Sequence, residues 1–212
     1  MSRQGLTEII DFSALLSVEE PQAPHPSGGI IFVRMPRFDE IETLHELTAS
    51  QIGPNVASLE AMQDVYRHNP ETMWMLFRSP TEDRADGKLA GYYAFLHLNA
   101  AGLEALENKT LRPLKPDLNL IANAGERPAA VYIWAIIARK LNLMAIPLVG
   151  KGLGVKRYGG LPFYATAATM AGLNGLKSYG FEDTSRPEDE KLGDVFKFYM
   201  PGEGDRPASS AA

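Results

Sequence analysis

The chain has 212 residues, which suits one folded domain with tails and is long enough to bury a sizeable core. Apolar residues make up 45% of the chain and charged residues 22%, close to the average of soluble globular proteins. A net charge of -5 without an obvious basic face disfavours a nucleic-acid partner, and the absence of cysteine excludes disulfides, thiolate metal sites and a cysteine nucleophile.

Both ends of the chain differ in composition from its middle. Residues 1–29 contain EEPQAPHPSGG, which is typical of a linker, and residues 201–212 have the sequence PGEGDRPASSAA, typical of a disordered tail. We therefore expect a folded domain over residues 30–200, with both ends dispensable for its folding. The start, MSRQGLTEII, lacks a long uncharged apolar core, so we expect neither a secretory signal nor a membrane span. A cytoplasmic location is compatible with these features.

The first half of the domain predicts a strand, two helices and two further strands. GIIFVRMP is rich in β-formers, and Phe38, Ile41, Leu44 and Leu47 then recur at helical spacing. Ser58 can cap a second helix in SLEAMQDVYRHN. TMWMLFRS and GKLAGYYAFLHLN are typical of two strands joined by a polar turn.

The second half of the domain also predicts helices and strands in turn. AAGLEALENKTL predicts a helix, and residues 112–128 a loop. AAVYIWAIIA is nearly all apolar, as expected of a central strand buried on both faces. We then expect a helix that begins near Ala145 and a strand in LPFYATAAT. A short helix closed by Gly180 and a last strand in GDVFKFYM complete the predicted order. This order predicts an α/β protein with a central mixed β-sheet flanked by helices on both faces.

The segment ATAATMAGLNGLKSYGFED joins a strand, a bend of small residues, a short helix and Gly-Phe. This pattern, with Ala171 and Gly172 in the bend and Gly180-Phe181 at the end, resembles the end of the GNAT superfamily of N-acetyltransferases. The element order over about residues 30–200 resembles that superfamily as well. The resemblance implies an acyl-CoA N-acyltransferase fold and acyl transfer from acetyl-CoA, or another acyl-CoA, to an amine.

GNAT enzymes usually hold the CoA pyrophosphate on a turn directly after the fourth strand. Its pattern is a basic residue or Gln, two others, Gly, one other, then Gly or Ala. Aligned backbone N–H groups and a helix N-terminus attract the anion there, and glycine lets it approach closely. Here RKLNLMA places Lys140 at the basic position, Leu143 at the first glycine and Ala145 at the end. The alternative is that Arg139 and Lys140 simply end a strand at the surface.

A rival placement, VGKGLG, supplies Gly152 and Gly154 but has Val149 at the basic position. We prefer the first placement because the second leaves too few residues for the following helix. The resemblance also implies that a backbone N–H near Ile136 or Ile137 polarises the thioester carbonyl. The full implied set for acyl-CoA is Ile136, Ile137, Ala138, Arg139, Lys140, Leu143, Met144, Ala145, Gly152, Gly154 and Asn174.

Two residues are candidates for the proton chemistry. Many GNAT enzymes carry a Tyr five residues before the Phe of Gly-Phe, which protonates the leaving thiolate, but this chain has Leu176 there. Tyr164 is the candidate to replace it. His97 shares a strand face with Tyr93, and histidine is the residue type suited to proton transfer near neutral pH, so it is a candidate base; the alternative is a packed histidine at a strand end. Glu126 is a weaker candidate, and no metal is expected.

Two functions remain open at this point. One is an N-acyltransferase acting on a small-molecule or peptide amine, and the other is a non-catalytic GNAT-fold domain that binds a ligand or protein partner. Neither nucleic acid nor membrane is an expected partner, and a homodimer is left open. Acceptor specificity should lie in residues 53–57 and 110–128, because loops carry it. The Ala-rich strand ATAAT predicts that the fourth and fifth strands lie side by side and splay apart near Ile137.

Overall fold

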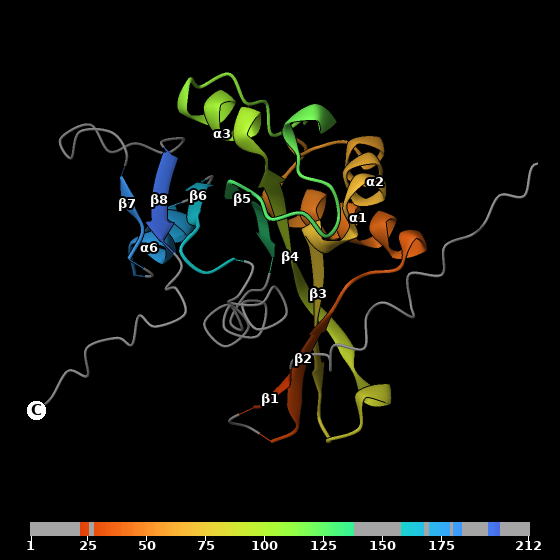
Figure 1. Ribbon diagram of the computed structural model, residues 1–212. Helices are drawn as coiled ribbons and strands as arrows, with labels where there is room; N and C mark the ends of the chain where they lie inside the picture. Colours follow the sequence, from red (N-terminus) through yellow and green to blue (C-terminus); the bar gives the residue numbers. More distant parts are fainter. Residues whose placement is uncertain are drawn as a thin grey trace, which may run out of the picture.

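The computed structural model describes residues 22–25, 28–137, 158–167, 170–178, 180–183 and 195–199. In this part of the chain, eight strands form one sheet in the order β1-β2-β3-β4-β5-β6-β8-β7 (Figure 1). The strands are β1 Gln22–Pro24, β2 Ile30–Arg34, β3 Met73–Ser79, β4 Lys88–Leu98, β5 Ala130–Ile137, β6 Pro162–Thr166, β7 Glu182–Asp183 and β8 Val195–Tyr199. All neighbours pair antiparallel except β5 and β6, which are parallel, so the predicted mixed sheet is confirmed.

Two strands were not expected from the sequence. Gln22–Pro24 pairs with Phe32–Ile30 of β2, so the linker predicted over residues 1–29 contains an edge strand. The pair Glu182–Asp183 lies against Lys197 and Phe196 of β8 and forms the other edge. Strands of two or three residues carry almost no periodic signal, which is why the sequence pattern missed both. Residues 1–21 and 200–212 lie outside the described residues, so their dispensability stays a prediction.

The helices cover both faces of the sheet, as predicted. In the described residues the helices are α1 Ile41–Ile52, α2 Leu59–His68, α3 Ala100–Glu107 and α6 Met170–Ser178, with short 3-10 turns at Phe38–Glu40, Pro70–Thr72, Arg84–Asp86 and Leu118–Leu120. Tyr164 packs in the core that contains Val65 of α2, whereas Ala165 packs against Leu173 and Leu176 of α6. Consecutive strand residues point to opposite faces, so α2 and α6 lie on opposite sides of β6.

Local signals explain how two of these helices begin and end. The Ser58 hydroxyl accepts a hydrogen bond from the Ala61 amide at 3.2 Å, which is the predicted N-cap of α2. Past the end of α6, Gly180 adopts a φ of 79°, where a side chain would be strained. The amide of Phe181 then donates to the Leu176 carbonyl at 3.1 Å, and its ring stacks on Phe198. Gly-Phe therefore ends the helix and anchors it to the sheet.

An ion pair fixes the start of α1 against the end of β2. Arg34 donates to both carboxylate oxygens of Glu40, at 2.7 and 2.8 Å, and the Arg37 amide donates to the same carboxylate at 2.7 Å. The Glu40 pKa is lowered from 4.5 to about 2, mainly by the hydrogen bond from Arg34. The folded-state pKa is depressed, so this stabilisation is present above pH 4.5 and is lost as the pH falls toward 2.

Glu40→Gln should therefore lower the free energy of unfolding by about 2 to 3 kcal/mol at pH 7, since one pKa unit corresponds to about 1.4 kcal/mol. The loss should shrink by about half at pH 3, because Glu40 becomes partly protonated in the unfolded and folded states of the wild type. Urea unfolding of both proteins at pH 7 and pH 3 measures this. Asp39→Asn is the matched control, because the Asp39–Arg37 pair is exposed and should contribute under about 1 kcal/mol. An equal loss at both pH values would contradict the electrostatic origin.

Candidate active site

Strands β5 and β6 lie side by side and then part. They pair at Val131–Phe163, Tyr132–Tyr164 and Ile133–Ala165. Beyond Ile133, β5 continues to Ile137 and stays paired with β4, but no further pair with β6 is present among the described residues. The predicted separation therefore begins after Ile133, four residues before the expected position.

The separation changes the environment of β5. Ala130, Val131 and Tyr132 are buried, whereas the next four residues are only half-buried. The prediction that the whole strand is buried on both faces is thus wrong for its second half. An apolar run resembles a fully buried strand in sequence whether or not a neighbouring strand continues beside it.

A β-bulge lies at the same point. Ala94 of β4 is opposite Ala135 while Phe95 is opposite Ile133, which leaves Trp134 as the extra residue of β5. Side chains of a regular strand alternate between faces, but the bulge lets Trp134 and Ala135 line the same pocket. The Trp134 indole N–H donates to the Pro113 carbonyl at 2.8 Å, which ties the loop after α3 to this strand.

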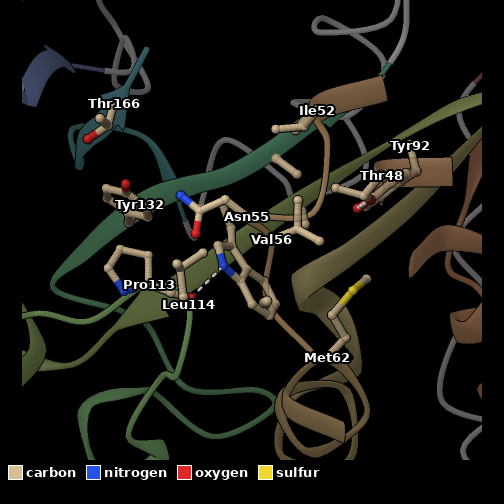
Figure 2. A pocket seen from close by; sticks show the side chains of 14 residues that line it. Thr48, Ile52, Asn55, Val56, Met62, Tyr92, Pro113, Leu114, Tyr132 and Thr166 are labelled. Atoms are coloured by element: carbon tan, nitrogen blue, oxygen red, sulfur yellow. Dashed lines mark hydrogen bonds between the residues drawn. The ribbon is translucent and has the colours of Figure 1, made fainter. Parts of the chain in front are cut away.

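The pocket has a volume of about 310 Å³, at the lower end for small-molecule sites (Figure 2). It lies on the α1–α2 face of the sheet, and both predicted specificity loops contribute to it. Its lining residues are Thr48, Ile52, Asn55, Val56, Ala57, Met62, Tyr92, Ala94, Pro113, Leu114, Tyr132, Trp134, Ala135 and Thr166. Ile52 and Leu114 are 42% and 48% exposed, so the last residue of α1 and the loop after α3 present apolar side chains at the surface of the pocket.

The polar groups of this lining are neutral. Among the described residues that line the pocket there is no Asp, Glu, His, Lys or Arg. Burial raises the pKa of Tyr92 to about 12, partly offset by its hydrogen bond with Thr48. Burial likewise raises the pKa of Tyr132, which is hydrogen-bonded to Thr166. Both phenols therefore stay protonated at neutral pH. The described lining favours an uncharged, largely apolar ligand.

The candidate residues Ile136 and Ile137 end β5 next to the separation. Ile137 is opposite Tyr92 and Ile136 is opposite Tyr93. The Ile137 side chain packs in the core between α1, α2 and the sheet, so any role in binding falls to its backbone. Ala138, Arg139, Lys140, Leu143, Met144, Ala145, Gly152 and Gly154, and the helix expected near Ala145, lie outside the described residues.

Asn174 is exposed on α6, the helix that packs on Ile133 and Ala165 from the face opposite the pocket. The position at which many GNAT enzymes carry a Tyr, Leu176, is buried against Ala165 and Phe196. A phenol at that position would have to replace a core side chain. The structure gives Leu176 a packing role.

The structure does not bring His97 to the pocket. Its side chain is 0% exposed, and its Nδ1 lies 3.2 Å from the Asn69 amide nitrogen and 3.4 Å from the Tyr158 hydroxyl. Tyr92 and Ala94 point to the pocket, so His97, an odd number of residues along β4, points to the other face. These contacts favour the alternative of a packed histidine over a catalytic one.

Tyr164 and Glu126 are likewise absent from the pocket lining. Tyr164 is buried in register with Tyr132, and the Lys197 ammonium lies 5.3 Å from its ring centroid. Glu126 is exposed and accepts the backbone N–H of Asn123 at 2.9 Å, a bond that lowers its pKa. Tyr164 therefore packs in the hydrophobic core, and Glu126 stabilises a turn.

The sequence did not single out Thr48 or Asn55 as pocket residues, whereas the aromatic side chains of Tyr92, Tyr132 and Trp134 were open to either a groove lining or core packing. Only the loop position of Asn55 was available as a signal. The placement of Trp134 depends on a bulge, and that of Thr48 on the side of α1 that faces β4.

No family model matches the chain, and no curated protein matches its sequence. Among solved structures, the loading GNATL domain of CurA from Lyngbya majuscula aligns with a TM-score of 0.51 at 11% identity, over 80% of this chain and 97% of that chain. The chain has the GNAT fold. Arabidopsis thaliana NAA60, solved in complex with a bisubstrate analogue, aligns with a TM-score of 0.48 at 14% identity, over 82% of this chain and 99% of that chain.

The GNAT fold predicted from Ala171, Gly172 and Gly180-Phe181 is thereby confirmed. At 11% identity the likeness concerns the fold and not the chemistry. In the part of the chain that the structure describes, His, Asp and Glu side chains form no cluster of three that could hold a metal ion. No helix in those residues has the length and apolarity to cross a bilayer.

Proposed function

We propose that this chain is an acyl-CoA-dependent N-acyltransferase whose acceptor amine occupies the pocket beside β5. The observation that carries the proposal is the parting of β5 from β6 next to that pocket. A separation between parallel strands leaves backbone groups of β5 unused by the ladder, and a substrate can pair with them. The acyl thioester would enter through the separation and the amine through the pocket.

The reaction requires few side chains. The amine nitrogen attacks the thioester carbonyl carbon, a C–N bond forms, the C–S bond breaks, and the CoA thiolate takes up the proton that the nitrogen loses. Backbone N–H groups near Ile136 or Ile137 would stabilise the negative charge on the carbonyl oxygen. The pocket excludes water through its apolar lining and holds the amine close to the reacting carbon.

The residues after Ile137 are proposed to hold the CoA phosphates. Arg139 and Lys140 are the second and third residues after the end of β5 in the sequence, and the proposal assigns them to the phosphates for that reason. Backbone amides over residues 140–145 would bind the pyrophosphate, with Leu143 restricting its approach. Gly152 and Gly154 remain the rival site, and Asn174 is placed on the helix that flanks the separation from the other face.

A second function is favoured by one specific feature. The described pocket lining contains no group that could act as a general base near neutral pH, and Leu176 occupies the position of the usual acid. A non-catalytic GNAT-fold domain would use the same pocket to bind a neutral ligand without chemistry.

Calorimetry with acetyl-CoA tests the proposal on the wild type, an Arg139→Ala/Lys140→Ala double variant and Leu143→Gly. We expect the wild type to bind. The double variant should bind more weakly, with a smaller dependence on salt, because two phosphate contacts are removed. Leu143→Gly should preserve or improve the affinity. At one hundred times the dissociation constant, acetyl-CoA should add about 2.7 kcal/mol to the stability of a binding variant.

Two other outcomes of this calorimetry would change the proposal. Wild-type binding that neither change affects would move the phosphate site to Gly152 and Gly154. A wild type that binds no acetyl-CoA would contradict acyl transfer and favour the non-catalytic domain. Release of free CoA thiol in the presence of a panel of amines then separates an enzyme from a domain that only binds acyl-CoA.

A further inference from the structure

The Tyr92 hydroxyl belongs to a directional hydrogen-bond chain at one end of the pocket. Figure 2 shows the Tyr92 and Thr48 side chains meeting there, and their two hydroxyl oxygens are hydrogen-bonded. The Thr48 hydroxyl also donates to the Leu44 carbonyl, one turn earlier in α1, at 2.7 Å. A threonine hydroxyl has a single hydrogen, so the hydrogen in the Tyr92–Thr48 bond must come from Tyr92.

This direction determines what Tyr92 can offer a ligand. Tyr92 is 1% exposed and its hydrogen is committed to Thr48, so a ligand group that reaches the phenol oxygen from the pocket meets only lone pairs. Successive donors in one chain polarise one another, and Tyr92 to Thr48 to Leu44 is such a chain. The Tyr92 oxygen is therefore a neutral hydrogen-bond acceptor. The raised pKa of Tyr92, about 12, keeps it in this form at neutral pH.

The position of Tyr92 matches the position that an amine must take. Tyr92 is opposite Ile137, at the end of β5 where the acyl carbonyl is expected. Two residues further along β4, Ala94 is opposite Ala135, and both line the pocket. Both side chains are short, so they add little bulk to the pocket wall two residues from Tyr92. The lining residues that the structure describes include no carboxylate to hold an ammonium ion, so a neutral amine with an apolar body fits them best.

We propose that Tyr92 binds the acceptor by accepting a hydrogen bond from its amine N–H, and that Thr48 is a positioning residue that keeps Tyr92 in this role. This inference rests on the proposed acyl transfer. One N–H held by Tyr92 directs the nitrogen lone pair toward the carbonyl carbon. Tyr92 takes no proton in the reaction, because the proton lost by the nitrogen goes to the departing thiolate. The favoured acceptors are primary amines on a small apolar body, such as 2-phenylethylamine.

The test uses the full chain, acetyl-CoA and 2-phenylethylamine, with release of CoA thiol as the readout. Tyr92→Phe should lower kcat/KM for the amine by about tenfold or more, the effect of one lost hydrogen bond, while KM for acetyl-CoA is unchanged. Thr48→Val should lower it by a smaller factor, because Tyr92 can then turn its hydrogen toward the pocket. Thr48→Ser keeps both hydrogen bonds and should restore the wild-type value.

Tyr66→Phe is the matched control for lost stability. The Tyr66 hydroxyl donates to the Pro36 carbonyl outside the pocket, so this change also removes a partly buried phenol hydrogen bond. It should leave KM for the amine unchanged. Equal effects of Tyr92→Phe and Tyr66→Phe on amine kinetics would overturn the proposal, as would a Thr48→Ser variant as impaired as Thr48→Val.

A binding measurement separates this inference from the proposed function. Without acetyl-CoA, 2-phenylethylamine should raise the melting temperature of the wild type and of Tyr66→Phe, and should raise that of Tyr92→Phe much less. If acetyl-CoA does not bind but the melting temperatures change in this way, the proposed acyl transfer is wrong and the amine site at Tyr92 is supported. If acetyl-CoA binds but 2-phenylethylamine neither stabilises the wild type nor is acetylated, the amine site proposed at Tyr92 is wrong.

Discussion

Ala135→Leu is expected to reduce amine turnover by about 100-fold or more while acetyl-CoA binding stays within about twofold of the wild type. Ala135 lines the pocket and lies opposite Ala94 across the β4–β5 pair. A leucine adds three carbon atoms to a cavity of about 310 Å³ at the place where the amine must approach the acyl group. Displacing a reacting group by about 1 Å can cost two orders of magnitude in rate. Steady-state kinetics and calorimetry with acetyl-CoA measure the two effects separately.

Ala101→Leu is the matched control. Ala101 is exposed on α3, away from the pocket lining, so the same change of side chain there should leave both turnover and acetyl-CoA binding unaltered. Full turnover by Ala135→Leu would mean that the acceptor does not use this pocket. Loss of acetyl-CoA binding in Ala135→Leu would place the donor, and not the acceptor, beside Ala135.

Gly102→Ala should destabilise the fold by about 3 kcal/mol. A Cβ at this position would lie 2.1 Å from the Leu120 carbonyl oxygen and 3.1 Å from the Leu98 Cβ. The nearest atom belongs to the backbone of the turn Leu118–Leu120, so it cannot rotate away as a side-chain tip would. The collision must separate α3 from that turn, and it outweighs the gain of up to about 1 kcal/mol that alanine brings to a helix. Urea unfolding at neutral pH measures the loss.

Gly175→Ala tests whether the collision is the cause. Gly175 also lies within a helix, α6, but a Cβ there would meet nothing within 4 Å. Its replacement should stabilise the protein by up to about 1 kcal/mol through helix propensity alone. The loop after α3 carries Pro113 and Leu114 of the pocket, so Gly102→Ala should also weaken amine binding. A Gly102→Ala protein as stable as Gly175→Ala would contradict the backbone contact.

The amino-acid sequence by itself determined the elements whose signals are local. Ser58 marks the start of α2, and Gly180-Phe181 marks the end of α6, because a cap or a left-handed residue acts within one turn of the chain. Hydrophobic spacing located α1 and the strands β2 to β6, and their order together with Gly-Phe predicted the GNAT fold that the comparison confirmed. These features need no knowledge of which residues far apart in the chain come together.

Only the tertiary structure decided the candidate site. The bulge at Trp134 and the parting of β5 from β6 depend on pairing between strands that no local pattern encodes. The same pairing turned His97 toward Asn69 and Tyr158, away from the pocket, and it placed Tyr92 beside Thr48 of α1. A strand residue in the sequence has two possible faces, and which face becomes a pocket is determined by the helices and loops that pack on it.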